Sequence, residues 1–518
     1  MRLALLLAAL FVLLPAAAPQ LGPQEFALAG TVVNRLSGAP VRNARVWLSS
    51  GEQVESDTTG AFSFAHLVAG QYGVAAFKAG FEEGEPVAVD LSASRADLAI
   101  RLTPLASIVG KIADADGEPV AGVVVVAMRS QIVEGWRRGV PAGQAITDDR
   151  GQYRIPWLPA GRYLVQAAGY DEHTFAGEPE AALKSSDAFA PVYFGDSRDR
   201  ALAPLLTLAP GAEAHADISI ALRTGHRIRG RLVGLKPYTQ PVLKLLSGDE
   251  DLGLNRSSVN FATGHFEIRN VFDGAYRLRV TGVGADDRPL GGEQEIQVAG
   301  RDVEDVSLAL GPGFVIKGTV RIGGPTEPAD KESIQQALDE FFLGLASPDG
   351  PTLNSEPAVD GAFRIPSAIP GKYRVGFLLP APLYVSSARS GDTDLLADPQ
   401  LVLRSSPPAD IEVVLRADGG SIEGTLAPEI MRDGPVCVLL VPESLRRPPE
   451  AACTGDGSFD FGGVAPGSYR LHAWNGKAEV EYNAPQVLRT LAGSGTRVDV
   501  QPSASAEIQL KTLSEVPQ

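Results

Sequence analysis

The sequence is poor in the residues that build cofactor-filled or metal-dependent cores. Its 518 residues include only 2 cysteines, 3 methionines and 6 histidines, and 7% are aromatic. No histidine occurs in a His-x-x-Glu or His-Glu-x-x-His pattern, so the paired ligands of a zinc hydrolase are missing. This composition argues against a helical enzyme core, and we expect neither a cofactor nor a metal site.

Other signatures of catalysis and ligand binding are also missing. There is no Gly-x-Ser-x-Gly turn for an acyl-enzyme nucleophile and no Gly-x4-Gly-Lys-Ser/Thr loop for phosphate. The acidic runs at 114–116 and 249–251 lack the ligand spacing of a calcium loop, and we interpret them as turns. We therefore predict a protein without catalytic residues. A composite site assembled from distant segments is the remaining enzymatic alternative.

Basic residues are fewer than acidic residues. The chain has 46 Lys and Arg against 62 Asp and Glu, which gives a formal net charge of −16. A general nucleic-acid binder needs a cationic surface that displaces counterions from phosphates. We therefore expect no nucleic-acid partner.

Long hydrophobic runs are scarce outside the N-terminus. There, Arg2 precedes an apolar run from Leu3 to Leu14, and small residues follow at 16–18. This order is typical of a signal peptide, and the run is too short for a bilayer, which takes about 20 residues. We expect residues 1–18 to be a signal peptide, and the exported protein to be periplasmic, on the outer surface or secreted, without a transmembrane segment after cleavage. A buried N-terminal helix is the alternative.

What the chain does contain is one pattern repeated five times. Gly-x-aromatic-x-apolar is followed by Gly-x-Tyr, and the two glycines are always 10 positions apart. Such a repeat indicates five copies of one supersecondary unit, with a turn, a strand, a second turn and a second strand. Because the tyrosine recurs in every copy, we expect it to serve the fold. The copies begin at Gly60, Gly151, Gly264, Gly361 and Gly457, and their tyrosines are Tyr72, Tyr163, Tyr276, Tyr373 and Tyr469.

Short alternating segments surround each copy and complete a larger module. Each module opens with a Gly-led strand and closes with an acid followed by alternating apolar residues. We predict an all-β protein of five tandem, seven-stranded antiparallel β-sandwiches with little helix. The short joints between modules predict a semi-rigid rod. The expected modules are 26–105, 106–224, 225–313, 314–418 and 419–515.

Several of these motifs resemble the carboxypeptidase regulatory-like domain. They are the Pro-Val-x-x-Ala-x-Val segment at 40–46, Asp-x-x-Gly-x-Phe at 57–62 and Pro-Gly-x-Tyr at 370–373. The resemblance implies a transthyretin-like (prealbumin-like) or immunoglobulin-like sandwich, related to carbohydrate-binding-like folds, and the accessory rather than the catalytic part of such peptidases. It covers essentially all of the chain after the signal. The third module departs most, with Thr263 where an acid is usual and no proline before Gly274.

Two classes of function remain open at this point. The first is a non-enzymatic scaffold of the cell envelope or exterior that binds a protein partner. The second is a carbohydrate-binding protein that presents exposed aromatic residues to a polysaccharide. Its candidate residues are Trp136, Trp157 and Trp474. We expect Trp136 to be exposed in a Gly- and Arg-rich insertion, whereas packing within or between modules is the favoured interpretation of Trp157 and Trp474.

The two cysteines lie in the last predicted module. Cys437 is part of an apolar run, and Cys453 follows a proline-rich segment 16 positions later. Two neighbouring antiparallel strands would bring them together, and a disulfide over such a loop would contribute ~3 kcal/mol. We expect this disulfide in an exported protein; two buried thiols are the alternative.

Overall fold

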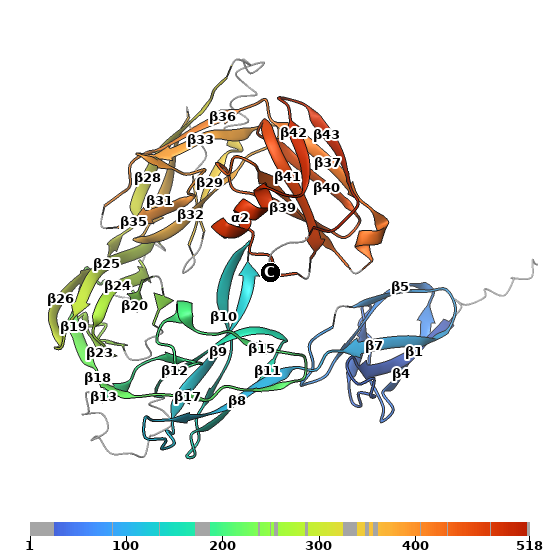
Figure 1. Ribbon diagram of the computed structural model, residues 1–518, viewed down its shortest axis with the longest axis horizontal. Helices are drawn as coiled ribbons and strands as arrows, with labels where there is room; N and C mark the ends of the chain where they lie inside the picture. The colour runs from blue at the N-terminus through green and yellow to red at the C-terminus, as the bar shows by residue number, and fades with distance from the viewer. Residues whose placement is uncertain are drawn as a thin grey trace, which may run out of the picture.

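The regular secondary structure of the computed structural model is almost entirely β-strand (Figure 1). It describes residues 25–84, 86–133, 135–170, 187–236, 239–248, 250–252, 257–284, 288–324, 339–347, 352–355, 361–404, 406–432, 434–476 and 478–514. The predicted signal peptide, residues 1–18, lies outside the described residues. Within them, no helix has both the length and the apolar character needed to span a membrane.

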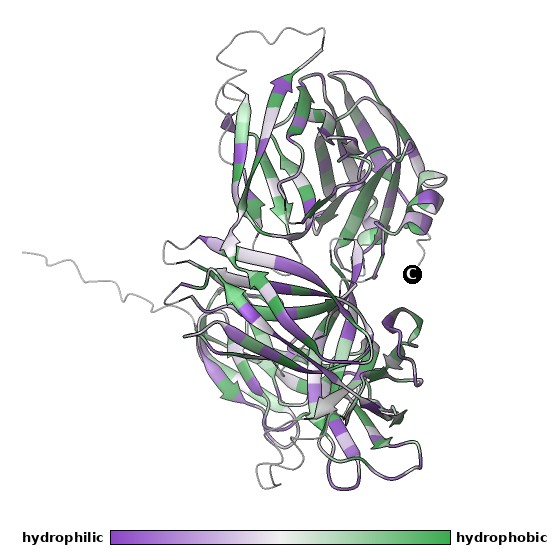
Figure 2. Ribbon diagram, turned by 90° about the vertical axis from the view of Figure 1, so that its left-hand side faces the viewer, coloured by the Kyte–Doolittle hydropathy of each residue, from purple (hydrophilic) through white to green (hydrophobic). Residues whose placement is uncertain are grey.

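Hydrophobic side chains collect in separate cores along the chain. Five clusters lie within residues 28–102, 106–220, 228–310, 316–415 and 422–510. Each draws on strands of two sheets, so each core fills a β-sandwich, and we call these segments modules 1 to 5. Hydrophobic and polar residues alternate along many of the strands, as expected where one face packs on a core (Figure 2). The predicted all-β class is confirmed.

Modules 1 and 2 lie at the N-terminal end. In module 1 the sheets have the orders β4-β1-β7 and β3-β2-β5-β6. Its strands are β1 (Glu25–Asn34), β2 (Arg45–Leu48), β3 (Gln53–Glu55), β4 (Ala61–Val68), β5 (Gly70–Phe77), β6 (Val87–Leu91) and β7 (Arg95–Leu102). Module 2 contains β8 (Ala106–Ala113), β9 (Val123–Val133), β10 (Trp136–Ile146), β11 (Gln152–Leu158), β12 (Gly161–Tyr170), β13 (Asp187–Phe189), β14 (Val192–Tyr193), the 3-10 helix η2 (Arg200–Leu202), β15 (Leu206–Leu208), β16 (Glu213–His215), β17 (Ile218–Ser219) and β18 (Leu222–Thr224).

Modules 3 and 4 follow. Module 3 contains β19 (His226–Val233), β20 (Val242–Ser247), β21 (Glu250–Asp251), β22 (Ser257–Val259), β23 (His265–Val271), β24 (Gly274–Val283), β25 (Pro289–Val298), β26 (Val303–Ala309) and β27 (Gly311–Pro312). Module 4 contains β28 (Phe314–Ile322), β29 (Phe342–Ala346), β30 (Leu353–Asn354), β31 (Ala362–Ala368), β32 (Gly371–Leu378), β33 (Tyr384–Ser390), β34 (Thr393–Asp394), β35 (Gln400–Leu403) and β36 (Ile411–Arg416).

Module 5 ends the chain and carries an added helix. Its sheets have the orders β40-β37-β43 and β39-β38-β41-β42. The elements are β37 (Gly420–Leu426), the 3-10 helix η3 (Pro428–Met431), β38 (Val436–Pro442), β39 (Glu450–Thr454), β40 (Ser458–Val464), β41 (Gly467–Asn475), α2 (Pro485–Ala492), β42 (Thr496–Val500) and β43 (Ser505–Leu510).

The repeated glycine has the same function in all five modules. It adopts a positive φ, from +69° at Gly151 to +88° at Gly457, a conformation that favours glycine. Its carbonyl then accepts a hydrogen bond from the opening strand of the module, as from Ile112 N to Gly151 O at 2.8 Å. The glycine of that opening strand pairs with the aromatic residue of the repeat, as Gly110 does with Tyr153. The repeat therefore ties its own first strand to the opening strand of the module.

The repeated tyrosine also has one function throughout. Its hydroxyl donates to the backbone carbonyl four residues earlier in every module, which fixes the loop between the two strands of the repeat. The five bonds are Tyr72 to Val68, Tyr163 to Pro159, Tyr276 to Phe272, Tyr373 to Ile369 and Tyr469 to Ala465, at 2.6–2.9 Å. The prediction that these tyrosines serve the fold is confirmed.

One feature of the sandwiches was not predicted. In each module the opening strand pairs in parallel with a strand near the end of the module, as β1 does with β7, β8 with β16 and β17, and β37 with β43. Its other neighbour is antiparallel. When an early and a late strand lie side by side and run in the same direction, the chain enters a sandwich at one end and leaves it at the other. The next module therefore starts at the far end, which suits a tandem array.

The array is not the rod predicted from the short joints. Modules 2 to 5 curve into a ring, and module 1 stands outside it (Figure 1). The long hairpin of β9 and β10 reaches across and meets α2 of module 5. The rod prediction was wrong because the length of a joint limits how far modules separate, whereas the direction of each turn depends on packing between their surfaces.

Candidate functional site

The tip of the β9–β10 hairpin closes the ring. The turn residue Gly135 has a φ of +74°, and its carbonyl accepts a hydrogen bond from Asn483 N at 3.0 Å. A Cβ atom at Gly135 would lie only 2.3 Å from the ring of Tyr482. The absence of a side chain at this position therefore allows module 2 to approach module 5 backbone to backbone.

Ion pairs from two strands of module 2, β10 and β12, support the same contact. Arg137 Nε donates to Glu481 Oε2 at 3.0 Å, and both side chains are about three-quarters buried. Arg162 lies 3.7 Å from Glu479, with both side chains more exposed. A partly shielded pair contributes more than a fully solvated one, for which ~0–1 kcal/mol is usual.

Module 4 contributes the third side of this junction. The guanidinium of Arg374 on β32 lies over the ring of Trp136 on β10, 5.6 Å from its centre. This cation–π contact holds the start of β10 against module 4. Modules 2, 4 and 5 thus meet around the hairpin tip.

A groove runs along the meeting line of modules 4 and 5. One cavity of 650 Å³ lies at the hairpin tip, and a second of 610 Å³ lies between the two sandwiches. The cavities share seven lining residues, among them Arg374, Arg447 and Pro448, so they form one elongated depression. We call it the junction groove; the volume of each of its two cavities is in the range of known ligand sites.

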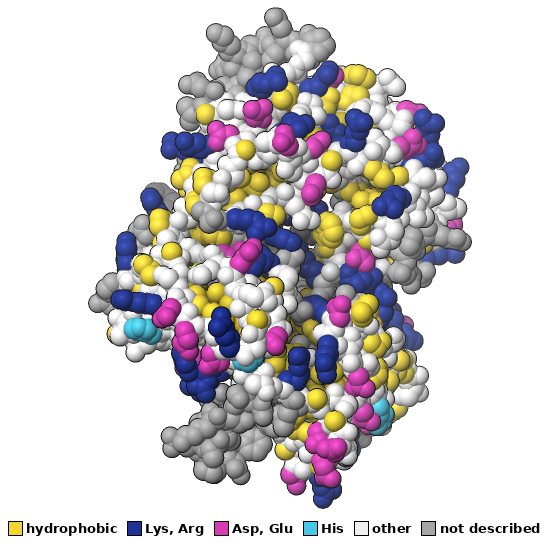
Figure 3. All heavy atoms as spheres, turned by 60° about the vertical axis from the view of Figure 1, so that its left-hand side comes forward, with side chains coloured by type: hydrophobic (Ala, Val, Ile, Leu, Met, Phe, Trp, Pro, Cys, Tyr) yellow, Lys and Arg dark blue, Asp and Glu magenta, His cyan; other side chains and the backbone are white. Residues whose placement is uncertain are grey.

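Basic side chains dominate the junction groove. Its lining includes five of them, Arg138, Lys372, Arg374, Arg447 and Arg489, but only two carboxylates, Asp398 and Glu450. In space-filling view, Lys and Arg side chains gather along the hollow that separates the upper and lower parts of one face (Figure 3). This local excess contrasts with the net charge of −16 of the chain.

The groove residues of module 5 include some that the sequence analysis missed. Pro485, Leu488 and Arg489 come from α2, the helix that was not expected. The signal was available, because Pro485 stands at the helix start and apolar residues follow with helical spacing up to Leu491. Its shortness, 8 residues, hid it among strands.

The three candidate tryptophans differ in their exposure to solvent. Trp136 is half-buried beneath Arg374 instead of exposed, and its indole nitrogen is buried without a hydrogen-bond partner among the described residues. Trp474 is only 6% exposed and packs near Tyr482 with a ring separation of 6.1 Å, as favoured. Trp157 is 68% exposed, so the favoured packing of this residue was wrong. The three side chains form no common aromatic surface.

The exposure of Trp157 follows from a repeated backbone feature. Six positions after the first glycine of the repeat, every module has a residue with positive φ where the strand register shifts. Such a bulge turns its side chain away from the ladder. The five bulge residues are His66, Trp157, Asn270, Ser367 and Gly463.

The bulges of modules 4 and 5 lie at joints with the preceding module. A Cβ at Gly313 would touch the backbone of Ser367, and one at Gly463 would lie 2.4 Å from Leu383 O in module 4. Modules 3, 4 and 5 therefore pack closely where the bulge residue is small. In module 2 the bulge residue is the large, exposed Trp157. Module 1 stands apart from the other four modules (Figure 1).

The two cysteines are bonded to each other. Cys437 on β38 and Cys453 on β39 are directly opposed in the antiparallel ladder and form a disulfide. Strand β38 is buried along its whole length, because α2 and neighbouring residues cover its outer face while the core covers the other. This explains the continuous apolar run around Cys437.

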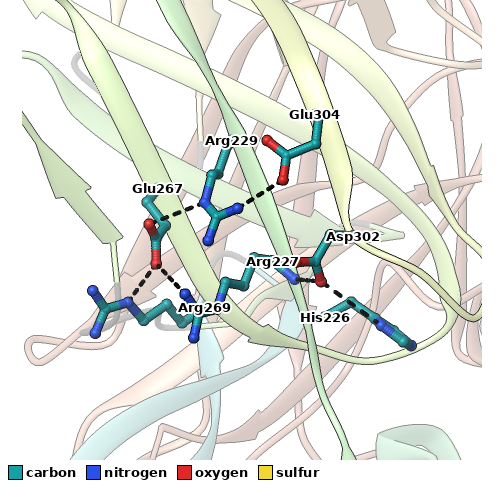
Figure 4. Close-up of polar contacts among 7 residues, drawn as sticks. All are labelled: His226, Arg227, Arg229, Glu267, Arg269, Asp302 and Glu304. Carbon is teal, nitrogen blue, oxygen red and sulfur yellow. Dashed lines mark hydrogen bonds and ion pairs between the residues drawn. The ribbon is translucent and has the colours of Figure 1, made fainter. Parts of the chain in front are cut away.

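A network of charged side chains lies on one face of module 3 and joins neighbouring strands. Glu267 on β23 accepts hydrogen bonds from Arg229 at 3.2 Å and Arg269 at 2.6 Å (Figure 4). Burial alone would raise the pKa of Glu267, but these two guanidinium groups lower the pKa below its usual value. Arg229 also donates to Glu304 at 2.7 Å. Each charged side chain of this network therefore has a partner of opposite charge.

Histidines and carboxylates are dispersed over the rest of the fold. In the part of the chain that the structure describes, no three His, Cys, Asp or Glu side chains gather closely enough to hold a metal ion. In module 3, His226 lies 3.4 Å from Asp273. The backbone N–H of the next residue, Arg227, donates a hydrogen bond to the carboxylate of Asp302. These contacts join β19 to adjacent loops.

A known protein family matches the first two modules. The family model of the carboxypeptidase regulatory-like domain matches residues 27–103 and again residues 107–186. Modules 1 and 2 are carboxypeptidase regulatory-like domains. The shared glycine and tyrosine hydrogen bonds extend the same construction to modules 3 to 5. No curated protein matches the chain.

Several solved structures match this chain at low sequence identity. The minor pilin GBS52 of Streptococcus agalactiae is 16% identical, with 38% of this chain and 95% of that chain covered at a TM-score of 0.21. The shaft pilin SpaA of Lactobacillus rhamnosus GG is 11% identical, with coverage of 39% and 98% and a TM-score of 0.22. The Bacillus anthracis TIE protein is 9% identical, covering 94% and 68%, at a TM-score of 0.16. These TM-scores are too low for the likeness to bear on function.

Proposed function

We propose that this protein is a non-enzymatic scaffold of the cell envelope or exterior that binds protein partners. The observation that carries the proposal is the closure of the ring by the β9–β10 hairpin, where Arg137 and Gly135 of module 2 contact Glu481 and Asn483 of module 5. Closure fixes the spacing and orientation of loops from four modules. A fixed array of surfaces is what an interaction scaffold needs, because preorganisation reduces the entropy lost on binding.

The domain limits and the export of the chain belong to the same proposal. The five domains are those of the sequence analysis, 26–105, 106–224, 225–313, 314–418 and 419–515, and residues 1–18 are the signal peptide. The carboxypeptidase regulatory-like domain is the accessory part of the peptidases that carry it, which supports a role without catalysis. Sequencing of the N-terminus of the exported protein tests the signal peptide directly.

Crosslinking in the intact envelope of cells that make the protein tests the scaffold function. We expect the wild-type chain to capture a reproducible set of envelope proteins, and the ring-opening variant Arg137→Glu to lose part of that set. The combined exchange Arg137→Glu with Glu481→Arg serves as the matched control and should restore capture. Equal capture by all three proteins, or none by any, contradicts a scaffold that depends on ring closure.

Binding of a polysaccharide is the second candidate, favoured only by the exposed ring of Trp157. Depletion of the mature protein by a panel of soluble and insoluble polysaccharides tests it. Retention on one glycan that is lost in Trp157→Ala and kept in Trp474→Phe would establish this function. Without such retention the scaffold is the better account.

A further inference from the structure

The junction groove has the shape of a site for an extended ligand. Its two cavities, of 650 and 610 Å³, join end to end through shared residues that include Arg374 and Arg447. One end lies at Trp136 of the closing hairpin, and the other lies between β32 and the loops of module 5. A compact small molecule would leave most of this length empty, whereas an extended peptide would follow it.

The charge of the groove selects an acidic ligand. Five basic side chains against two carboxylates line it, within a chain whose net charge is −16. Arg138 and Arg489 are exposed at its rim, where their charge acts on an approaching ligand. A negatively charged segment would be attracted to this groove and repelled by the acidic remainder of the surface, which favours one binding position.

The groove also has an apolar wall. Leu378 at the end of β32 is 69% exposed although it lines the groove, and Leu445 and Leu488 are half-buried beside the hairpin. Apolar side chains of a ligand would remove this surface from water, at about 25 cal/mol per Å². The wall therefore favours a ligand that has apolar groups next to its acidic ones.

The lining favours a peptide over a polysaccharide. The apolar groups of the wall suit the side chains of a peptide. A polysaccharide would need more aromatic stacking surface than the half-buried Trp136 and Phe377 offer.

We propose that the junction groove binds an extended peptide segment of a partner protein, in which acidic residues stand beside apolar residues. This proposal rests on the scaffold function above and names the surface that carries it. The occupied groove would bridge modules 4 and 5 at the point where module 2 closes the ring. Binding would therefore also stabilise the closed arrangement.

The test is fluorescence anisotropy with the full mature chain and labelled peptides of equal length. One peptide combines Glu with Leu, a second combines Lys with Leu, a third combines Glu with Ser, and oligogalacturonate serves as an acidic saccharide. We expect the Glu–Leu peptide to bind most tightly and to weaken as salt is added. Tightest binding of oligogalacturonate, or equal binding of the Lys–Leu peptide, overturns the proposal.

Variants of the groove localise the binding. We expect Arg489→Glu and Leu378→Ser each to weaken the Glu–Leu peptide by about tenfold, since each removes one contact of the groove. The matched controls are Arg364→Glu and Val402→Ser, exposed residues of module 4 outside the groove, which should bind as the wild type does. Circular dichroism and thermal unfolding check that every variant is folded. Equal weakening by the controls would place binding elsewhere and overturn the proposal.

Crosslinking separates failure of this inference from failure of the scaffold function. If the Arg489→Glu and Leu378→Ser variants still capture the full set of envelope proteins, the scaffold stands and the groove is not its binding surface. If the wild-type chain captures none, the scaffold function itself fails.

Discussion

Arg137 on β10 donates from Nε to Oε2 of Glu481 at 3.0 Å, although the two residues lie 344 positions apart in the sequence. This pair joins the second module to the fifth, with Gly135 and Asn483 hydrogen-bonded beside it. This contact between modules that are not neighbours in the sequence closes modules 2 to 5 into a ring. The groove that we assign to a peptide lies next to this contact.

Opening the ring should change the shape of the molecule without unfolding its modules. In Arg137→Glu the partly buried contact becomes repulsive, so we expect a larger radius of gyration in small-angle X-ray scattering. The combined exchange with Glu481→Arg should return the wild-type value, and the coupling energy of the pair should be about 1 kcal/mol. A radius unchanged in the single variant would mean that the remaining contacts of the hairpin suffice.

Removing the hydroxyl of a repeated tyrosine should destabilise its module. Tyr469 is 6% exposed, donates to Ala465 O at 2.6 Å, and has a pKa that burial raises to about 12, so it stays a neutral donor through neutral pH. We expect Tyr469→Phe to cost about 1–2 kcal/mol, because the carbonyl loses its partner. Denaturant unfolding measures this. Tyr72→Phe, at a more exposed position, is the matched control and should cost less.

The disulfide should stabilise module 5 selectively. Cys437 and Cys453 close a loop of 16 positions between adjacent strands. Replacing both by alanine should lower the free energy of unfolding by about 3 kcal/mol, chiefly because the unfolded chain gains freedom. Differential scanning calorimetry with and without reductant would show this. Reductant should lower the unfolding temperature of the wild type and leave that of the double variant unchanged.

Acidification should destabilise module 5 through His472. Burial lowers the pKa of this imidazole from 6.5; its Nε2 donates to Leu491 O at 2.9 Å, and Nδ1 has no partner among the described residues. Because the folded pKa is the lower one, the unfolded chain takes up the proton first as pH falls below 6.5. Stability is therefore present above that pH and is lost as pH falls toward the folded pKa.

Denaturant unfolding of the wild type and of His472→Gln, from neutral pH to about pH 5, measures this dependence. The variant should be less stable at neutral pH, since a buried side chain is changed, and the difference should narrow on acidification. A difference that stays constant with pH would contradict the assignment.

Much of the fold could be predicted because it is local and repeated. The positive φ of Gly151 and its equivalents, and the bond from Tyr163 to Pro159, depend on residues a few positions apart. The repeated bulge was missed because His66, Trp157 and Ser367 share a backbone conformation but no side-chain chemistry. For that reason Trp157 was expected to pack, whereas it projects into solvent.

The sequence by itself determined the β-sandwich class, the repeat and the structural role of its glycines and tyrosines, because those follow from backbone conformation and alternation within each module. Only the tertiary structure decided that modules 2 to 5 form a ring, that Trp136 lies beneath Arg374, and that basic residues of three modules line one groove. These features depend on how module surfaces pack against each other. Short-range patterns in the sequence carry no information about contacts between residues hundreds of positions apart.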